Sequence, residues 1–540
     1  MSASTVLSNS TRYLSAGAYI DAEFRDAVID ELLGDRYRAV APSHGRTDAR
    51  TVLMHCLRAR RVTLIRDGVI TLLLVLALGL DIGTTLGLLI GIVPLALLSR
   101  RTARGNPVLR ALLIIWAALV VFGFIAQLMI ILLYQAVVTG MGLPQTTSVG
   151  VVRPGYVLLL LALIVAVSYW VFQYIQLSTT FDFGRPHTVP QESIPAERDW
   201  YIDQAQRGNL ALYGGEDPFI GAGQPHQTWS IVVELDRRPP NPGAAAGERR
   251  NATIDPIELH AFIRERLEQM RIGVLNERES IAKLTVSDHL TAPGTLHLGM
   301  GTHPLLGPAG MPIFSLDPMA VDAVKQNPQG AMRYYQRVTV GTEGPPIISS
   351  AGALVVPASD REIDISAFIH LAVEGRMMYT QCLITALPPC RRSFHVIDVL
   401  PALSPVAVVG KALAALRLRL FEEVLFAPVR LVKMVFEQNR QQRPGRFLAY
   451  PFGARASVRE LGAESEPTSF MQVLDIDKYS KLISQRLNEA VLDYLEARDI
   501  DTTSYRQQAI VNYGAWVSGG TVNGPIAAGH QAQATQQGAS

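Results

Sequence analysis

Histidine and cysteine side chains are the first candidates for chemistry in this chain, because they serve as nucleophiles, general bases and metal ligands. Two histidines bracket two cysteines, and an aspartate follows them: His370, Cys382, Cys390, His395 and Asp398. A cysteine–histidine catalytic arrangement is one interpretation of this stretch. The other is a pair of buried structural thiols on a strand or turn. We favour the second, because no spacing in the sequence fixes a common geometry for these groups.

Signatures of established catalytic and cofactor sites are absent from the sequence. It contains no phosphate-binding loop, zinc-protease, serine-hydrolase or kinase motif. The pair Gly221 and Gly223 precedes an expected strand, so it predicts a tight turn, not a dinucleotide site. His55 and Cys56 are neighbours on an expected helix and cannot share a face. We therefore predict no catalytic, cofactor-binding or metal-binding residue, and an enzyme is the less favoured class.

Composition bounds the remaining classes. The 540 residues are 49% hydrophobic and 18% charged, with a mean hydropathy of +0.20. A formal net charge of +2 gives no reason to expect nucleic acid as a partner. Three cysteines without metal-binding spacing are typical of a reducing compartment.

Three apolar stretches predict a transmembrane region within residues 61–177. They are residues 69–99, 111–138 and 156–175. About 20 apolar residues span the roughly 30 Å of hydrocarbon, so the second and third stretches fit one helix each. The first is too long for one upright helix and contains Asp81, whose carboxylate is costly inside lipid.

Arginines on both sides of the first stretch favour a hairpin over a single helix. A hairpin keeps both arginine groups on the cytoplasmic side, as the positive-inside rule prefers. We therefore predict four crossings, against three for a single helix, with both termini cytoplasmic. The arginines are Arg58, Arg60, Arg61, Arg66, Arg100, Arg101, Arg104 and Arg110.

Four glycines recur every fourth residue in the first apolar stretch: Gly79, Gly83, Gly87 and Gly91. This spacing lays small residues along one helix face, where another helix can approach closely. The seam predicts helix packing, either between copies of the chain or against the next span. We favour packing within one chain. The series also favours a continuous helix through Asp81, which is the main argument against the hairpin.

Two soluble regions flank the spans. Residues 1–60 show helical spacing of apolar side chains and predict a cytoplasmic helical cap. Residues 205–400 alternate expected strands and helices and predict a cytoplasmic α+β domain. An internal repeat is expected within this domain, because Ala261-Phe262-Ile263 and Ala367-Phe368-Ile369 each follow an aromatic-led strand at a similar distance. The repeat places both tripeptides on helices.

Residues 401–507 predict a helical region that begins with an amphipathic helix over residues 406–440. Leucines and valines fill one side, charges fill the other, and Pro428 should kink or split the helix. One interpretation is a helix on the inner leaflet. The alternative is a helix packed on the soluble core. The membrane interpretation names four basic residues as interface contacts: Lys411, Arg419, Arg430 and Lys433.

Two further predictions concern the C-terminal part. A helix is expected over 475–498, with Asp475 or Asp477 as its N-cap. Residues 508–540 predict a β-prone segment followed by a disordered, Gln/Ala-rich end.

Four segments together resemble a group of uncharacterised actinobacterial multi-pass membrane proteins. They are Arg12–Tyr19, Asp217–Gly223, Leu387-Pro388-Pro389 and Val517–Val522. The resemblance implies a multi-pass membrane protein and brings no function with it.

We predict an integral protein of the cell membrane that acts as a scaffold or sensor, with a cytoplasmic domain that binds a partner. The expected partners are the lipid bilayer, a protein bound through the soluble domain or the tail, and a second copy of the chain. The alternatives are a transporter or channel component, or a membrane-bound enzyme of unrecognised type.

Overall fold

The computed structural model divides into two compact units. A helical unit comprises residues 1–6, 55–192 and 395–442, and an α/β unit comprises residues 7–54, 193–394 and 443–540. The described residues are 7–43, 47–99, 108, 111–116, 118–119, 129, 153–182, 187–237, 252–272, 280–281, 283–297, 304–307, 310–344, 346–416, 419–438 and 449–514.

Two apolar helices dominate the helical unit. Helices α3 (Ala49–Leu80) and α7 (Pro154–Thr180) are long and apolar enough to cross a membrane, and α4 (Ile82–Ser99) is a shorter apolar helix. The span expected at 111–138 lies almost entirely outside the described residues.

The chain turns at Asp81, between α3 and α4. The carboxylate of Asp81 accepts a hydrogen bond from the Thr84 amide at 3.2 Å, and the Thr85 hydroxyl donates to the carbonyl of Ala77 at 2.9 Å. In one continuous helix, residues 77 and 85 would be about 12 Å apart along the axis. The helix therefore breaks at Asp81, within the stretch that was predicted to form a hairpin. The number of crossings stays a prediction.

The expected amphipathic helix is three helices, α12 (Pro405–Leu416), α13 (Arg419–Leu425) and α14 (Ala427–Gln438). The break between α13 and α14 falls just before Pro428, as predicted. Helix α12 contacts α7, and α13 contacts both α4 and α7. Val424 is fully buried in a cluster with residues of these apolar helices. Part of the apolar side, around Val424, thus packs on the apolar helices of its own unit, whereas Leu413 is 46% exposed.

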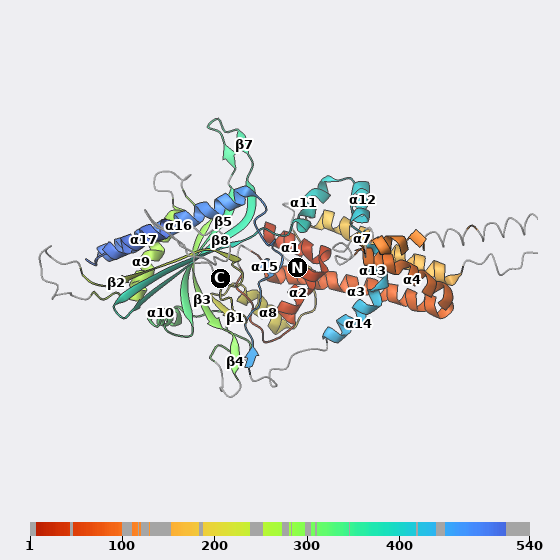
Figure 1. Ribbon diagram of the computed structural model, residues 1–540, viewed down its shortest axis with the longest axis horizontal. Helices are drawn as coiled ribbons and strands as arrows, with labels where there is room; N and C mark the ends of the chain where they lie inside the picture. The colour runs from red at the N-terminus through yellow and green to blue at the C-terminus, as the bar shows by residue number, and fades with distance from the viewer. Residues whose placement is uncertain are drawn as a thin grey trace, which may run out of the picture. The chain divides into compact units, whose positions relative to one another are not determined.

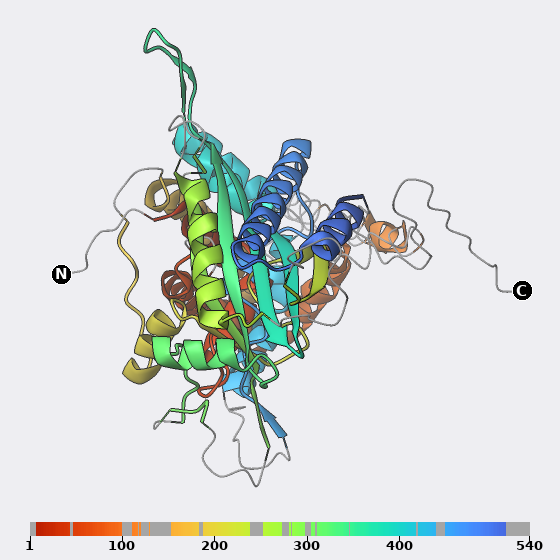
Figure 2. The same ribbon diagram turned by 90° about the vertical axis from the view of Figure 1, so that its left-hand side faces the viewer.

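A six-stranded sheet organises the α/β unit (Figures 1 and 2). The strand order is β1-β3-β5-β8-β9-β2, with β1 parallel to β3 and the other neighbours antiparallel. The strands are β1 (Leu210–Tyr213), β2 (Gln224–Glu234), β3 (Leu284–Pro293), β5 (Arg333–Gly344), β8 (Ser359–Glu374) and β9 (Met377–Leu387).

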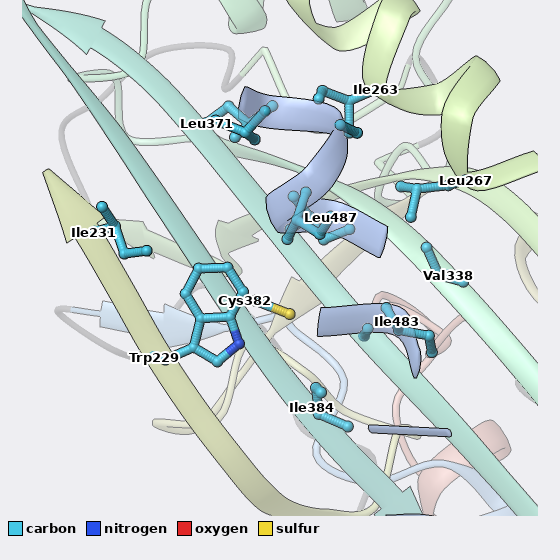
Figure 3. Packing of buried hydrophobic residues seen from close by; sticks show 14 of the residues in the cluster. Trp229, Ile231, Ile263, Leu267, Val338, Leu371, Cys382, Ile384, Ile483 and Leu487 are labelled. Carbon is cyan, nitrogen blue, oxygen red and sulfur yellow. The ribbon is translucent and has the colours of Figure 1, made fainter. Parts of the chain in front are cut away.

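Helices α9 (Pro256–Glu268), α16 (Phe470–Glu496) and α17 (Thr503–Gly514) cover one face of the sheet. Aliphatic side chains from alternate strand positions pack against them in the main core, shown in part in Figure 3. Trp229 joins β2 to α16, because its indole nitrogen donates to the Ser484 hydroxyl at 3.1 Å. The core therefore depends on segments that are far apart in the chain.

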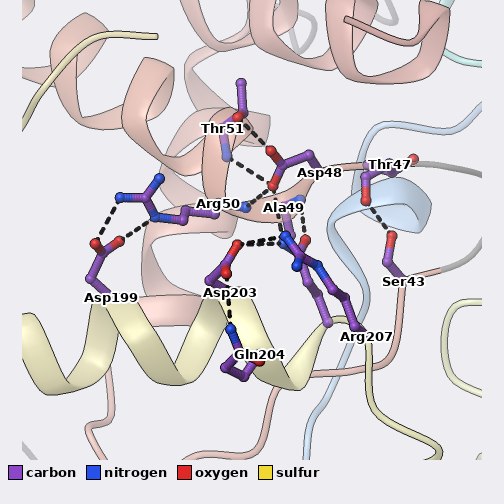
Figure 4. Close-up of polar contacts among 11 residues, drawn as sticks. Ser43, Thr47, Asp48, Ala49, Arg50, Thr51, Asp199, Asp203, Gln204 and Arg207 are labelled. Atoms are coloured by element: carbon purple, nitrogen blue, oxygen red, sulfur yellow. Dashed lines mark hydrogen bonds and ion pairs between the residues drawn. The ribbon is translucent and has the colours of Figure 1, made fainter. Parts of the chain in front are cut away.

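The N-terminal helices form within residues 1–60 as expected, and residues 7–54 belong to the α/β unit. Helices α1 (Asn9–Ile20) and α2 (Ala22–Leu33) lie before α3, and the first turn of α3 is tied to α8 (Ala196–Ala205). Arg50 binds Asp199 through two hydrogen bonds of 2.7 and 2.8 Å, as Figure 4 shows. This bidentate pairing fixes the orientation of both side chains.

The internal repeat is wrong. Residues 367–369 lie in β8, a central strand between β5 and β9, and not on a helix. Both faces of this strand are covered, so its apolar residues run without a break and mimic a buried helix in sequence.

Two boundaries near the C-terminus also differ from prediction. Helix α16 begins at Phe470, and a reciprocal capping box between Ser469 and Gln472 starts it; neither Asp475 nor Asp477 does. Residues 508–514 are helical, and 515–540 lie outside the described residues. Residues 347–356 form a separate hairpin of two strands, β6 (Ile347–Ile348) and β7 (Leu354–Val356).

The remaining elements are short. They are β4 (Thr295–His297), β10 (Ala449–Pro451), α10 (Pro318–Gln326), α11 (Val396–Val399), α15 (Val458–Leu461) and the 3-10 turns Gln269–Arg271, Arg392–His395 and Leu400–Ala402.

Candidate functional site

A polar pocket lies between α9, α10 and β5 in the α/β unit. Its volume is about 210 Å³. Asp255 caps α9 and Asp317 caps α10, and a proline follows each cap, so both helices begin at defined positions. The residues that line the pocket are Ile257, His260, Ala261, Arg264, Glu265, Glu268, Lys325 and Tyr334. The α9 residues recur at helical spacing, and Leu259 and Ile263 of the same helix point into the core.

A carboxylate on β3 holds the two polar groups at one side of this pocket. The Tyr334 hydroxyl donates to Asp288 Oδ1 at 2.7 Å. Arg264 forms an ion pair with the same oxygen. Burial, and next the neighbouring Asp288, raise the pKa of Tyr334 above its ordinary range, so the phenol stays protonated and keeps donating.

His260 is the most deeply buried of the pocket's ionisable residues, with 2% of its surface exposed. Its ring meets the Tyr334 ring edge to face, with 4.7 Å between centroids. Burial first, and then the charge of Lys325, lower the pKa of His260 to about 3, so the imidazole is neutral at physiological pH. Its Nδ1 has no hydrogen-bond partner among the described residues. A ligand or a water molecule could supply that partner.

Gln336 adds a second buried group with unused hydrogen-bonding capacity. It lies directly opposite Asp288 in the ladder between β3 and β5 and is fully buried. Neither its amide nitrogen nor its amide oxygen has a partner among the described residues. Buried polar groups normally have partners, so polar atoms left unpaired on the α9 side of the sheet point to a site for a ligand or ordered water.

Charge at the pocket is mixed. Lys325 lies on α10 with its ammonium 5.0 Å from the centre of the Tyr334 ring and 2.9 Å from Asp322. Arg264 faces from α9, and Glu265 and Glu268 line the same pocket. Two cations, a neutral imidazole and a phenol offer hydrogen-bonding groups to a small polar ligand.

The cysteine stretch shows no catalytic geometry. Cys382 is paired with Ile369 across the ladder between β8 and β9 and points into the main core, whereas His370 is the next residue on β8 and points to the opposite face. Burial raises the pKa of Cys382 and of Cys390 to about 12, so both thiols are protonated and unreactive. The interpretation as buried structural thiols agrees with these positions.

Three glycines of the seam have no close neighbour among the described residues. A Cβ added at Gly79, Gly83 or Gly87 would meet no described atom within 4 Å. Whether these glycines pack against another copy or within the chain stays a prediction. The inclusion of Gly91 in the seam also stays a prediction.

The four basic residues proposed for the membrane interface are not equivalent. Lys411, Arg419 and Lys433 are exposed. Arg430 instead lies in an ion-pair network, with its Nε 2.8 Å from Asp67 and an Nη 3.2 Å from Glu423. Arg66, on the opposite side of this network, is 2.7 Å from both carboxylates. These contacts fasten α13 and α14 to α3, so membrane contact stays a prediction for the other three residues.

His55 meets a partner that spacing alone does not indicate. Its Nε2 is 2.8 Å from Nε2 of His187, and the ring of Phe181 stacks on His187 with 5.1 Å between centroids. One imidazole must donate and the other accept, so at least one of them is neutral. Among the described residues, no group of three metal-ligating side chains surrounds the pair or any other place.

Sequence patterns did not identify the residues of the polar pocket. Asp288 and Tyr334 come from strands, Arg264 and His260 from α9, and Lys325 from α10. One signal was present. His260 and Arg264 stand four residues apart on a helix whose other side is aliphatic, which places them on one face.

A family model described as an AbeC-like domain matches residues 228–524. No curated protein and no solved structure matches the chain.

Proposed function

This chain belongs to the AbeC-like domain family, and the matched region contains every residue of the polar pocket. We propose that it is a membrane-anchored sensor. In this proposal the apolar helices hold the chain in the cell membrane. The α/β unit binds a small ligand that carries an acidic group and relays its presence to a protein partner.

The polar pocket is the observation that carries this proposal. It places cations from two helices beside a buried histidine with an unpaired nitrogen, within a unit that has its own core. Each unpaired buried polar atom costs about 1–3 kcal/mol unless a ligand or an ordered water molecule pairs with it. A sensor recovers that cost when the ligand binds.

Lys325→Gln tests the ligand directly. Full-length protein purified from its native membranes should carry a small acidic molecule that acid extraction and mass spectrometry detect. The variant should carry at least about tenfold less, because a charge-assisted contact is worth roughly 1.5–3 kcal/mol. Lys478→Gln changes an exposed lysine outside the pocket and should retain the molecule. Equal retention in both variants, or no molecule in wild-type protein, would contradict the proposal.

The topology in this proposal has four crossings and places both termini in the cytoplasm. The arginine groups before and after the Asp81 turn support it, because each lies beside the apolar hairpin. A reporter enzyme that works only outside the cytoplasm, fused after Ser540, should therefore be inactive. An active reporter at that position would overturn this topology without affecting the ligand proposal.

A further inference from the structure

The hairpin β6–β7 stands apart from the six-stranded sheet. It forms a sheet of its own two strands, and within the described part of the chain no other strand pairs with it. Figures 1 and 2 show it extending beyond the other elements of the α/β unit. A turn closed by Ser349 and Ala353, with Gly352 at a φ of +79°, joins the strands. We call residues 346–358 the arm.

The arm is apolar on both faces. Its large side chains are exposed, up to 63% for Leu354: Ile347, Ile348, Leu354, Val355 and Val356. Consecutive strand residues point to opposite faces, so these runs of two and three residues leave neither face polar. A hairpin that merely covered its own core would be apolar on one face only. The described residues therefore leave both faces of the arm without a covering.

A second apolar surface lies at the base of the arm. The first turns of α16 expose Phe470, Met471, Val473 and Leu474, with 75% exposure at Phe470. Gln472 of the same turn donates to the carbonyl of Arg361 at 2.9 Å, and Arg361 lies at the start of β8 just after the arm. The arm and this turn therefore belong to one end of the α/β unit.

The composition of this surface argues against lipid as its covering. Residues 344–359, which contain the arm, include no lysine, arginine, tryptophan or tyrosine. These residues are the ones that anchor a protein surface at the headgroups of a membrane.

We propose that a second copy of this chain covers the arm. An uncharged arm is complementary to itself, because residues 344–359 carry no charge that would repel an identical segment. Exposed strand edges without charged residues pair readily with other strands. A two-fold axis would pack the arms of two copies against each other, with Val355 of one copy close to Val355 of the other.

The available apolar area suits such a pairing. A standard interface buries roughly 800 Å² per partner. Nine large side chains, most of them about half exposed, offer an area of that order. Apolar helices that confine copies to one membrane would also raise their local concentration.

Val355→Asp tests this interface in the full-length protein. In nanodiscs or mild detergent, light scattering over a dilution series should show a dimer of the wild-type chain. The variant should need at least tenfold higher concentration to dimerise, because it places two carboxylates face to face. Met319→Asp changes a side chain that is 83% exposed on α10 and should dimerise as wild type does. A monomeric wild-type chain, or a Val355→Asp chain that dimerises unchanged, would overturn the proposal.

A cross-link supplies a second, geometric measurement. Val355→Cys should form a disulfide-linked dimer under mild oxidation, since the three native cysteines are buried. A fluorophore attached at the same position tests whether membrane lipid, and not a second copy of the chain, covers the arm. Quenching by spin-labelled lipids, without any cross-linked dimer, would show that lipid covers the arm and would overturn the proposal.

Discussion

Replacing Tyr505 with alanine is expected to destabilise the α/β unit by about 4 kcal/mol, the range found when a large buried ring is removed. Tyr505 lies on α17, has no exposed surface and belongs to the main core. Its hydroxyl donates to Asn488 on α16 at 2.8 Å, so the alanine variant also leaves a buried amide without this donor. Thermal denaturation of the full-length protein should show a midpoint lowered by roughly 5 °C.

Two controls separate the parts of this effect. Tyr505→Phe keeps the ring and should cost only about 1–2 kcal/mol for the lost hydrogen bond. A chain that ends after Gly514 keeps α17 whole and should melt as the full chain does, whereas one that ends after Asp501 loses α17 and should melt far lower. If the chain ending after Asp501 kept its midpoint, α17 would not be part of the core.

Acidification from pH 7 to pH 5 is expected to destabilise the α/β unit, by roughly 2 kcal/mol from His260 alone and by a further amount from His289. Burial lowers the pKa of His260 to about 3, and burial, followed by the charge of Arg337, holds the pKa of His289 well below its usual 6.5. In the unfolded chain both should titrate near 6.5, so the unfolded state takes up protons first as the pH falls.

The direction of this effect follows from that order of protonation. The contribution of each histidine to the free energy of unfolding is complete above about pH 6.5. It is lost as the pH falls toward the pKa of that histidine in the folded state. Denaturant unfolding at pH 7, 6 and 5 should show the decline. His260→Gln should be less stable at pH 7. Its stability should nevertheless fall less steeply as the pH is lowered, because its unfolding takes up about one proton fewer. An unchanged slope in this variant would mean that His260 is charged in the folded protein.

Hydrophobic periodicity and proline positions correctly identified the elements whose structure depends on residues close in the sequence. The strand around Trp229, the helix that contains Ala261 and the break before Pro428 were all predicted from periodicity or from proline geometry, and the structure confirms them. Asp81 was placed at a turn from the cost of burying a charge, and the helix does end there.

Hydrophobic periodicity gave the wrong secondary structure where an element is buried on all sides. The segment around Phe368 reads as a helix because its apolar residues are continuous, yet it is the central strand β8. Burial on both faces removes the alternation that distinguishes a strand from a helix. The N-terminal helices look self-contained, but contacts such as Asp21 with Arg391 at 2.6 Å place them in the α/β unit.

By itself the sequence determined where the apolar helices lie, that charge gives no reason to expect a nucleic-acid partner, and that established catalytic motifs are absent, because each of these depends on composition or on nearby spacing. Only the tertiary structure showed which residues meet in the polar pocket and which apolar residues of the arm are exposed. Asp288 reaches Arg264 and Tyr334 because β3, α9 and β5 fold together. The arm's apolar residues differ from core residues only in being left uncovered. Residue type records a side chain's chemistry, whereas its partners and its exposure depend on segments distant in the chain.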